Sequence, residues 1–125
     1  FSEADRVENI CRIAEVSQLF VDAGLIVIVS FISPYRAERM LARDRVAKDE
    51  FFEIFVDTPV DECRRRDPKG LYVKADAGQI RNFTGVDAPY EAPLAPEIRL
   101  RTLEATPEEL ADQVIDTLRA AGTVA

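Results

Sequence analysis

The sequence predicts an α/β fold in which helices flank a parallel sheet. Residues 25–29, 51–56 and 98–103 have the length and composition of strands, and helical patterns separate and follow them. Strands that alternate with helices are typical of a parallel sheet, because parallel neighbours need a crossover connection. With 125 residues, 47% of them hydrophobic, the chain is predicted to form a single domain over 1–125 with a core of its own.

Composition excludes several classes of function. The net charge of -7 argues against binding of nucleic acid or of an anionic membrane. Residues 64–83 depart from that balance, with six basic and two acidic side chains; this stretch suits a small anion, and a solvated helix face is the alternative. The chain contains no histidine, and Cys11 and Cys63 are too far apart for a zinc site. Without a signal peptide or long apolar run, a reducing cytoplasm is the expected location.

The first expected element is a helix over 1–23. Ser2 and Asp5 resemble a capping pair at its start, and apolar residues recur along it at helical spacing. Arg6 and Asn9 are three residues apart, so a helix brings them onto the same face.

The next element is the predicted centre of the sheet. Five consecutive apolar residues over 25–29 are typical of a strand covered on both faces. Pro34 ends this strand, so Ser30 and Ser33 should lie at its carboxyl end, where open α/β sheets bind ligands. A simple turn with a local hydroxyl hydrogen bond is the alternative for Ser33 and Pro34.

The middle of the chain alternates in the same way. A charged helix is expected over 35–46, a second buried strand over 51–56 and a short helix over 60–66. From 67 to 96 the pattern is irregular, with short helix signals over 71–77 followed by glycines and prolines. Long irregular segments in compact domains are often functional, so we expect 67–96 to form a lid.

A last strand and helix complete the chain. Residues 98–103 predict a third, shorter strand. Thr106 is a typical cap residue and Pro107 suits the first helical position, so a helix should run from there to about residue 121.

Five motifs resemble those of the adenylyl-sulfate kinase (APS kinase) family, in the same order along nearly the whole chain. They are Phe1-Ser2-x-x-Asp5-Arg6-x-Glu8-Asn9-Ile10, Ser30-Phe31-Ile32-Ser33-Pro34, Phe52-Glu53-Ile54-Phe55-Val56, Arg66-Asp67-Pro68-Lys69-Gly70-Leu71-Tyr72 and Phe83-Thr84-Gly85-Val86-Asp87-x-x-Tyr90-Glu91-x-Pro93. Each motif is weak alone, but the ordered set is specific.

The resemblance implies a P-loop kinase fold of three layers, only part of which this chain would contain. The family transfers the γ-phosphate of ATP to the 3′-hydroxyl of adenosine 5′-phosphosulfate and uses Mg²⁺. The resemblance also implies a homodimer, and association with or fusion to ATP sulfurylase. No nucleic acid or membrane partner is expected.

The resemblance assigns roles to individual residues. Those expected to bind adenylyl sulfate are Phe1, Arg6, Asn9, Ile32, Ser33, Lys69 and Phe83. Of these, Ser33 matches the serine that the family carries as a phosphoserine intermediate, although direct in-line transfer is simpler, and Lys69 should lie near the transferring phosphate. Arg66, Ala105 and Leu110 match positions that contact the adenine of ATP. No residue is assigned as a metal ligand.

The chain also departs from the family pattern. No G-x-x-x-x-G-K-[ST] phosphate loop occurs in it, nor the family's Asp-Gly-Asp stretch, and both are expected upstream of Phe1. The alternative is a non-catalytic half-domain that binds nucleotide or assembles with a sulfate-activating complex. Cys11 stands in place of a second arginine, Asn82 in place of a glycine, and Ala105 is small for an adenine-lining residue.

Overall fold

The computed structural model describes residues 2–125, so the predicted substrate residue Phe1 lies outside the described residues. The chain divides into two compact units. The first comprises the residues up to 51 together with 90–92, and the second comprises 52–89 and 93–125. The assignment of the chain to a single domain remains a prediction.

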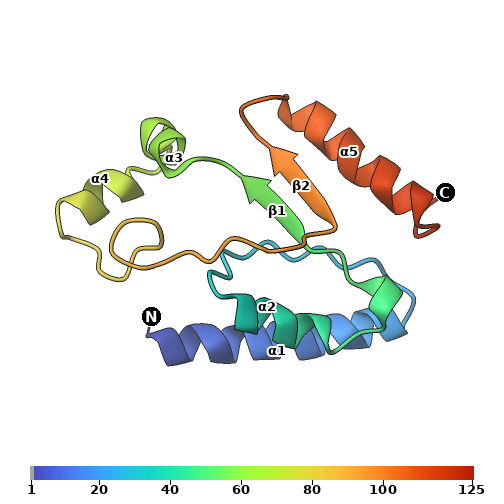
Figure 1. The fold of residues 1–125 in the computed structure, drawn as a ribbon. Helices are drawn as coiled ribbons and strands as arrows, with labels where there is room; N and C mark the ends of the chain where they lie inside the picture. Colours follow the sequence, from blue (N-terminus) through green and yellow to red (C-terminus); the bar gives the residue numbers. More distant parts are fainter. Residues whose placement is uncertain (1) are drawn as a thin grey trace. The chain divides into compact units, whose positions relative to one another are not determined.

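The first unit is helical. It contains α1 (Glu3–Asp22), α2 (Arg36–Arg43) and the 3₁₀ turn η1 (Lys48–Glu50). Helices α1 and α2 pack along each other, as Figure 1 shows. Each contributes one buried residue, Ala14 from α1 and Glu38 from α2.

The start of α1 confirms the capping pair predicted from sequence. The backbone N–H of Asp5 donates to Ser2 Oγ at 3.1 Å, and the backbone N–H of Ser2 donates to Asp5 Oδ2 at 2.9 Å. These bonds satisfy donors that the first helical turn leaves without an intrahelical partner. They also lower the pKa of Asp5, chiefly through the side chain of Ser2.

The predicted central strand over 25–29 is wrong. Residues 25–35 form neither helix nor strand, and none of the described residues pairs with them in a ladder. Six large apolar side chains between residues 25 and 32 are 45% to 90% exposed, with Ile28 the most exposed, whereas Val27 is half-buried. A strand depends on a neighbour that accepts and donates its backbone hydrogen bonds, which an apolar run does not specify by itself.

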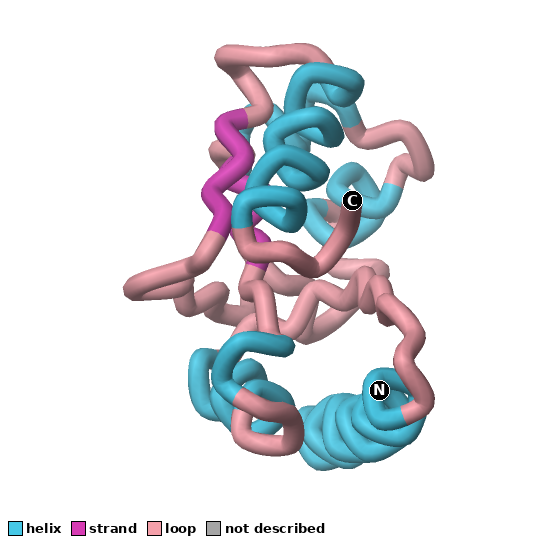
Figure 2. The backbone as a smooth tube through the Cα atoms, turned by 90° about the vertical axis from the view of Figure 1, so that its right-hand side faces the viewer, coloured by secondary structure: helices cyan, strands magenta, loops and turns pink. Residues whose placement is uncertain are grey.

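The second unit contains the sheet. Its elements are β1 (Ile54–Asp57), α3 (Val60–Arg66), α4 (Leu71–Asp76), β2 (Ile98–Arg101) and α5 (Pro107–Ala120). Strands β1 and β2 are parallel, with Ile54 opposite Ile98 and Asp57 opposite Arg101. Helix α5 packs against β2, and Figure 2 shows it alongside the strands. The predicted arrangement of helices around a parallel sheet is therefore confirmed.

The two strands differ in burial. Ile98 and Leu100 of β2 are buried, since α5 covers that strand. By contrast, Ile54 and Val56 of β1 are 41% and 60% exposed, so the prediction of a buried strand over 51–56 is wrong in burial and only partly right in extent. No helix among residues 2–125 has the length and apolar character needed to cross a membrane.

Candidate functional site

The loop before α2 carries the predicted site residues Ile32 and Ser33. Ile32 is 69% exposed, and Ser33 is half-buried with a φ of 36°. Side chains other than that of glycine rarely adopt positive φ, and such backbone conformations often occur at functional sites. Since Pro34 follows directly, the loop turns sharply at the position that sequence analysis singled out.

A distant segment holds this loop in place. Arg39 of α2 donates from Nη1 to the carbonyl oxygen of Ser33 and from Nη2 to that of Glu91, both at 2.5 Å. The backbone N–H of Glu91 donates to the carbonyl oxygen of Pro34 at 2.8 Å. The carboxylate of Glu91 also caps α2, because its Oε1 accepts from the N–H of Arg36 at 3.0 Å. Sequence analysis missed these roles of Arg39 and Glu91, which are 52 residues apart.

Arg6 and Asn9 lie on α1, as predicted, and both are half-buried. Asn9 lines a hollow of about 350 Å³ together with Asp5, Glu8 and Arg12. Arg12 donates from Nε to Glu8 Oε1 at 2.8 Å, so its charge is already matched. Asp5 and Glu8 bring negative charge to this hollow, and Arg6 is not among the described residues that line it.

Glu38 of α2 is a buried carboxylate in the same unit. Its side chain is 5% exposed, and neither carboxylate oxygen has a hydrogen-bond partner. Burial raises the pKa of Glu38, and the negative charges of Glu3 and Glu91 raise it further, while Arg39 and Arg6 lower it. Because the folded state favours the protonated carboxyl, ionised Glu38 destabilises the fold at neutral pH, and acid relieves that cost.

In the second unit, Lys69 lies on the turn between α3 and α4. Asp67 organises this turn, because its two carboxylate oxygens accept from the backbone N–H groups of Tyr72 and Val73, each at 3.1 Å. Although burial raises the pKa of Asp67, these and a further backbone hydrogen bond lower it overall. Lys69 is exposed, and none of the acids described in residues 2–125 pairs with it. Its ammonium group is therefore available to an anion.

Phe83 lies on a loop organised by a second aspartate. Asp87 accepts from the backbone N–H of Phe83 at 2.6 Å and from that of Asn82 at 2.8 Å. Asn82 has a φ of 56°, the region that asparagine tolerates better than most residues, which explains why it can replace the family's glycine. The ring of Phe83 meets that of Tyr72 edge to face, 5.0 Å between centroids. Sequence analysis gave Asp67 and Asp87 no role of their own, although an aspartate beside a turn that contains glycine is a usable signal.

The residues predicted to contact the ATP adenine follow the carboxyl ends of the two parallel strands. Arg66 ends α3, the helix after β1, whereas Ala105 and Leu110 flank the first turn of α5, the helix after β2. The cap of α5 confirms the prediction for Thr106: its Oγ1 accepts from the N–H of Glu109 at 3.3 Å. This edge of a parallel sheet is where α/β proteins bind ligands.

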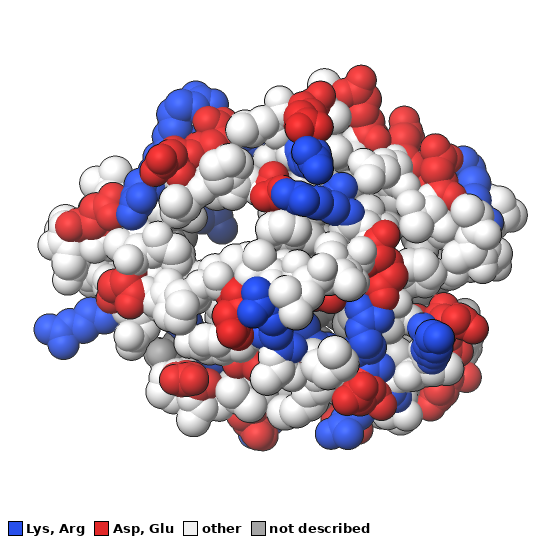
Figure 3. All heavy atoms as spheres, in the orientation of Figure 1, with Lys and Arg blue, Asp and Glu red and all other residues white. Residues whose placement is uncertain are grey.

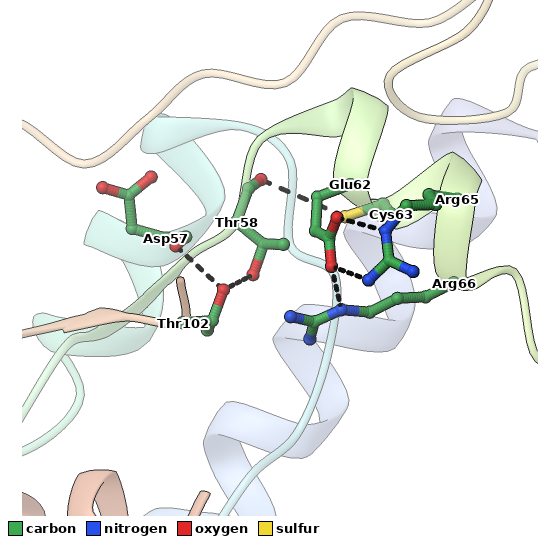
Figure 4. A network of polar contacts seen from close by, with 7 residues as sticks. All are labelled: Asp57, Thr58, Glu62, Cys63, Arg65, Arg66 and Thr102. Atoms are coloured by element: carbon green, nitrogen blue, oxygen red, sulfur yellow. Dashed lines mark hydrogen bonds and ion pairs between the residues drawn. The ribbon is translucent and has the colours of Figure 1, made fainter. Parts of the chain in front are cut away.

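Two polar clusters support this edge, as Figure 4 shows. The Oγ1 atoms of Thr58 and Thr102 lie 2.6 Å apart and join the ends of the two strands. Glu62 accepts from the guanidinium groups of Arg65 and Arg66 at 2.6 to 2.7 Å. The side-chain hydrogen bonds from Arg65 and then Arg66 lower the pKa of Glu62 to about 2. Arg66 donates to Glu62 from Nε alone, and its side chain stays 48% exposed.

The basic stretch over 64–83 is not one continuous positive surface. Arg64 lies 3.4 Å from Asp76, and Arg65 and Arg66 pair with Glu62. On the face drawn in Figure 3, basic side chains lie beside acidic ones. Much of the stretch is therefore an ion-paired helix surface, the alternative that the sequence left open.

The structure groups the predicted site residues by unit. Arg6, Asn9, Ile32 and Ser33 belong to the first unit; Arg66, Lys69, Phe83, Ala105 and Leu110 belong to the second. A shared site made from both groups remains a prediction. Among residues 2–125, no group of three or more side chains of the types that ligate metals is arranged to hold a metal ion.

A family model, a solved structure and curated relatives all match this chain. The family model described as adenylylsulphate kinase matches residues 1–101. The solved structure of the Mycobacterium tuberculosis APS kinase CysC in complex with AMPPNP and APS is 48% identical, with a TM-score of 0.88, over 95% of this chain and 69% of that one. Bifunctional enzyme NodQ of Rhizobium sp. (strain N33) is 66% identical over 112 residues, and bifunctional enzyme CysN/CysC of Xylella fastidiosa is 59% identical over 122.

These matches define the class of protein first: the fold is that of the P-loop kinases, as predicted. The chain belongs to the adenylylsulphate kinase family. The matches to NodQ and CysN/CysC include 90% to 98% of this chain, but only 17% to 20% of the length of those relatives.

Proposed function

We propose that the protein containing this chain is an adenylyl-sulfate kinase. It transfers the γ-phosphate of ATP to the 3′-hydroxyl of adenosine 5′-phosphosulfate (APS) and forms 3′-phosphoadenylyl sulfate (PAPS), a step of sulfate assimilation. The observation that carries this proposal is the similarity, at 48% identity and a TM-score of 0.88, to a kinase solved with both AMPPNP and APS. AMPPNP is an analogue of ATP, so that structure presents the two substrates of this reaction.

Residues that the family resemblance assigns to the sulfonucleotide occur in each of the two units. Arg6 and Asn9 on one face of α1 suit the phosphosulfate, because guanidinium and amide groups donate hydrogen bonds to its oxygens. Phe1 and Phe83 would stack on the adenine, and a base–aromatic stack contributes roughly 1–3 kcal/mol. Ile32 and Ser33 would line the same site, which is supported by their place on the sharply turned loop before α2.

The chemistry asks the protein mainly for positioning and charge neutralisation. In an in-line transfer, the 3′-oxygen of APS forms a bond to the γ-phosphorus, the bond to the bridging oxygen breaks, ADP leaves and the hydroxyl proton is released. We assign Lys69 to the neutralisation of the transferring phosphate, a role that its exposed and unpaired ammonium group supports. We assign Ser33 to substrate positioning, since direct transfer requires no phosphoserine.

On the ATP side, Arg66, Ala105 and Leu110 would contact the adenine. Their positions after the carboxyl ends of β1 and β2 support this assignment. The reaction is expected to use Mg²⁺ bound to ATP. The described residues do not fit a metal site of their own, so we assign no magnesium ligand and derive no step through the metal.

The relatives that carry the word bifunctional suggest the setting of this activity. We propose that the kinase is one part of a protein with a second activity, for which ATP sulfurylase is the expected partner, and that it forms a homodimer. The two free cysteines, Cys11 and Cys63, suit a reducing cytoplasm.

The test is an assay of the full-length protein with ATP, Mg²⁺ and APS, in which PAPS is separated by anion-exchange chromatography. We expect PAPS and ADP in equal amounts. Lys69→Ala should lower kcat at least tenfold, whereas Lys74→Ala, a matched change on α4 in the same segment, should leave kcat within twofold. If the protein binds both nucleotides but forms no PAPS, the kinase proposal is wrong and the non-catalytic half-domain is the better description.

A further inference from the structure

The strained backbone at Ser33 needs a physical cause. Its φ of 36° is rare for a residue with a side chain, yet the local sequence contains no glycine that would make this turn easy. A conformation of this kind persists only when surrounding contacts determine it. The contacts that hold the loop should therefore be found in the structure around Ser33.

One guanidinium group supplies most of these contacts. The two terminal nitrogens of Arg39 donate separately to the carbonyl oxygens of Ser33 and Glu91, at 2.5 Å each. The planar, forked guanidinium can serve two acceptors at once, which the single ammonium of lysine cannot do in the same geometry. We call Ser33, Arg39 and Glu91 the Arg39 latch.

The far side of the latch is also fixed. Glu91 donates its backbone N–H to the Pro34 carbonyl at 2.8 Å and caps the first N–H of α2, while Arg36 Nε donates to the carbonyl oxygen of Ala92 at 2.8 Å. The ring of Tyr90 lies 5.8 Å from the guanidinium carbon of Arg39, which adds a cation–π contact. Residues 90–92 are thus anchored on the loop that carries Ser33.

The position of the anchored segment gives the latch a consequence for ligand binding. Residues 90–92 directly follow the loop organised by Asp87, which carries Phe83. The latch therefore ties residues 90–92 to the Ser33 loop within one unit, and Ser33 is a residue that the proposed function assigns to APS.

We propose that Arg39 is a positioning residue for the sulfonucleotide site, and that it acts by holding Ser33 and residues 90–92 in one arrangement. This inference rests on the proposed kinase function. Arg39 itself contacts backbone carbonyls rather than substrate. Its loss should therefore weaken APS binding selectively and leave ATP binding nearly unchanged.

The experiment measures KM for APS, KM for ATP, kcat and the calorimetric Kd for APS in the full-length protein. Arg39→Ala should raise KM and Kd for APS at least tenfold and change KM for ATP less than twofold. Arg39→Lys keeps the charge but not the fork, and should recover less than half of the loss on a logarithmic scale. Arg45→Ala, which removes an exposed ion pair with Glu15, is the matched control and should change none of these values more than twofold.

A double-variant cycle separates positioning from a general loss of stability. Glycine adopts positive φ without a side-chain penalty, so Ser33→Gly should be less harmful in the Arg39→Ala background than in the wild-type protein. Equal effects of Ser33→Gly in both backgrounds, or an Arg39→Ala protein that binds APS like wild type, would overturn the inference. So would unfolding of both Arg39 variants, because the residue would then serve the fold rather than the site.

Different outcomes would refute the proposed function and the inference about Arg39. If the wild-type protein neither binds APS nor forms PAPS, the kinase assignment is wrong and the inference is lost with it. If wild type forms PAPS and the Arg39 variants match it, only the inference is wrong.

Discussion

Asp87 offers the sharpest test of how the Phe83 loop serves the site. Asp87→Ala removes the acceptor of two backbone hydrogen bonds, from Asn82 at 2.8 Å and from Phe83 at 2.6 Å. A hydrogen bond to a charged group contributes about 1.5 to 3 kcal/mol, and we take the low end because these groups are exposed. Two such bonds together stabilise the ordered loop by about 3 kcal/mol.

Only part of this stabilisation should affect the affinity for APS, because water replaces some of the lost hydrogen bonds. If half is transmitted, about 1.5 kcal/mol, the expected rise in KM for APS is roughly tenfold, since 1.4 kcal/mol corresponds to a factor of ten. KM for ATP should change less than twofold, because Phe83 is assigned to the sulfonucleotide alone.

The assay compares steady-state kinetics of the full-length wild type, Asp87→Ala and Asp116→Ala. Asp116 lies on α5 and makes only an exposed ion pair with Arg119 at 3.6 Å, so its removal should leave both KM values unchanged. Thermal midpoints are measured in parallel. A folded Asp87→Ala protein whose KM for APS stays within twofold of wild type would show that the aspartate does not position Phe83 for binding.

Three further predictions concern single residues. Arg6→Ala should weaken APS binding by calorimetry at least tenfold and ATP binding less than twofold; equal losses would contradict its assigned role. Glu38→Gln should raise the thermal midpoint at pH 7, and its advantage over wild type should shrink as the pH falls toward the carboxyl's ordinary pKa of 4.5; a pH-independent difference would count against a buried ionised group. Thr106→Ala removes the cap of α5 and should lower the free energy of unfolding by about 1 kcal/mol in denaturant titrations; Thr106→Asn, which keeps a cap, should not.

The parts of the fold that the sequence predicts correctly depend on near neighbours. The Ser2–Asp5 and Thr106–Glu109 capping pairs each lie three residues apart, so the pattern contains all the information that the contact needs. Helix limits follow from such caps and from apolar spacing. The family resemblance succeeds for a similar reason, because it compares many short motifs in a fixed order.

The errors concern relations between distant segments. An apolar run over 25–29 does not indicate which strand will pair with it, and none of the described residues pairs with it. For the same reason the sequence did not reveal that Arg39 would join Ser33 to Glu91, since that contact exists only after the chain has folded back on itself. The prediction that β1 is buried was wrong because α5 packs on β2. The sequence pattern alone does not indicate how much of a sheet a helix will cover.

The run from Leu25 to Ile32 also determines how the isolated chain should behave in the laboratory. Six of the eight residues in this run are apolar and exposed, and no strand among the described residues pairs with their backbone groups, so they can associate with a neighbouring molecule. Recombinant residues 1–125 should consequently scatter light increasingly with concentration, and mild detergent should suppress that scattering.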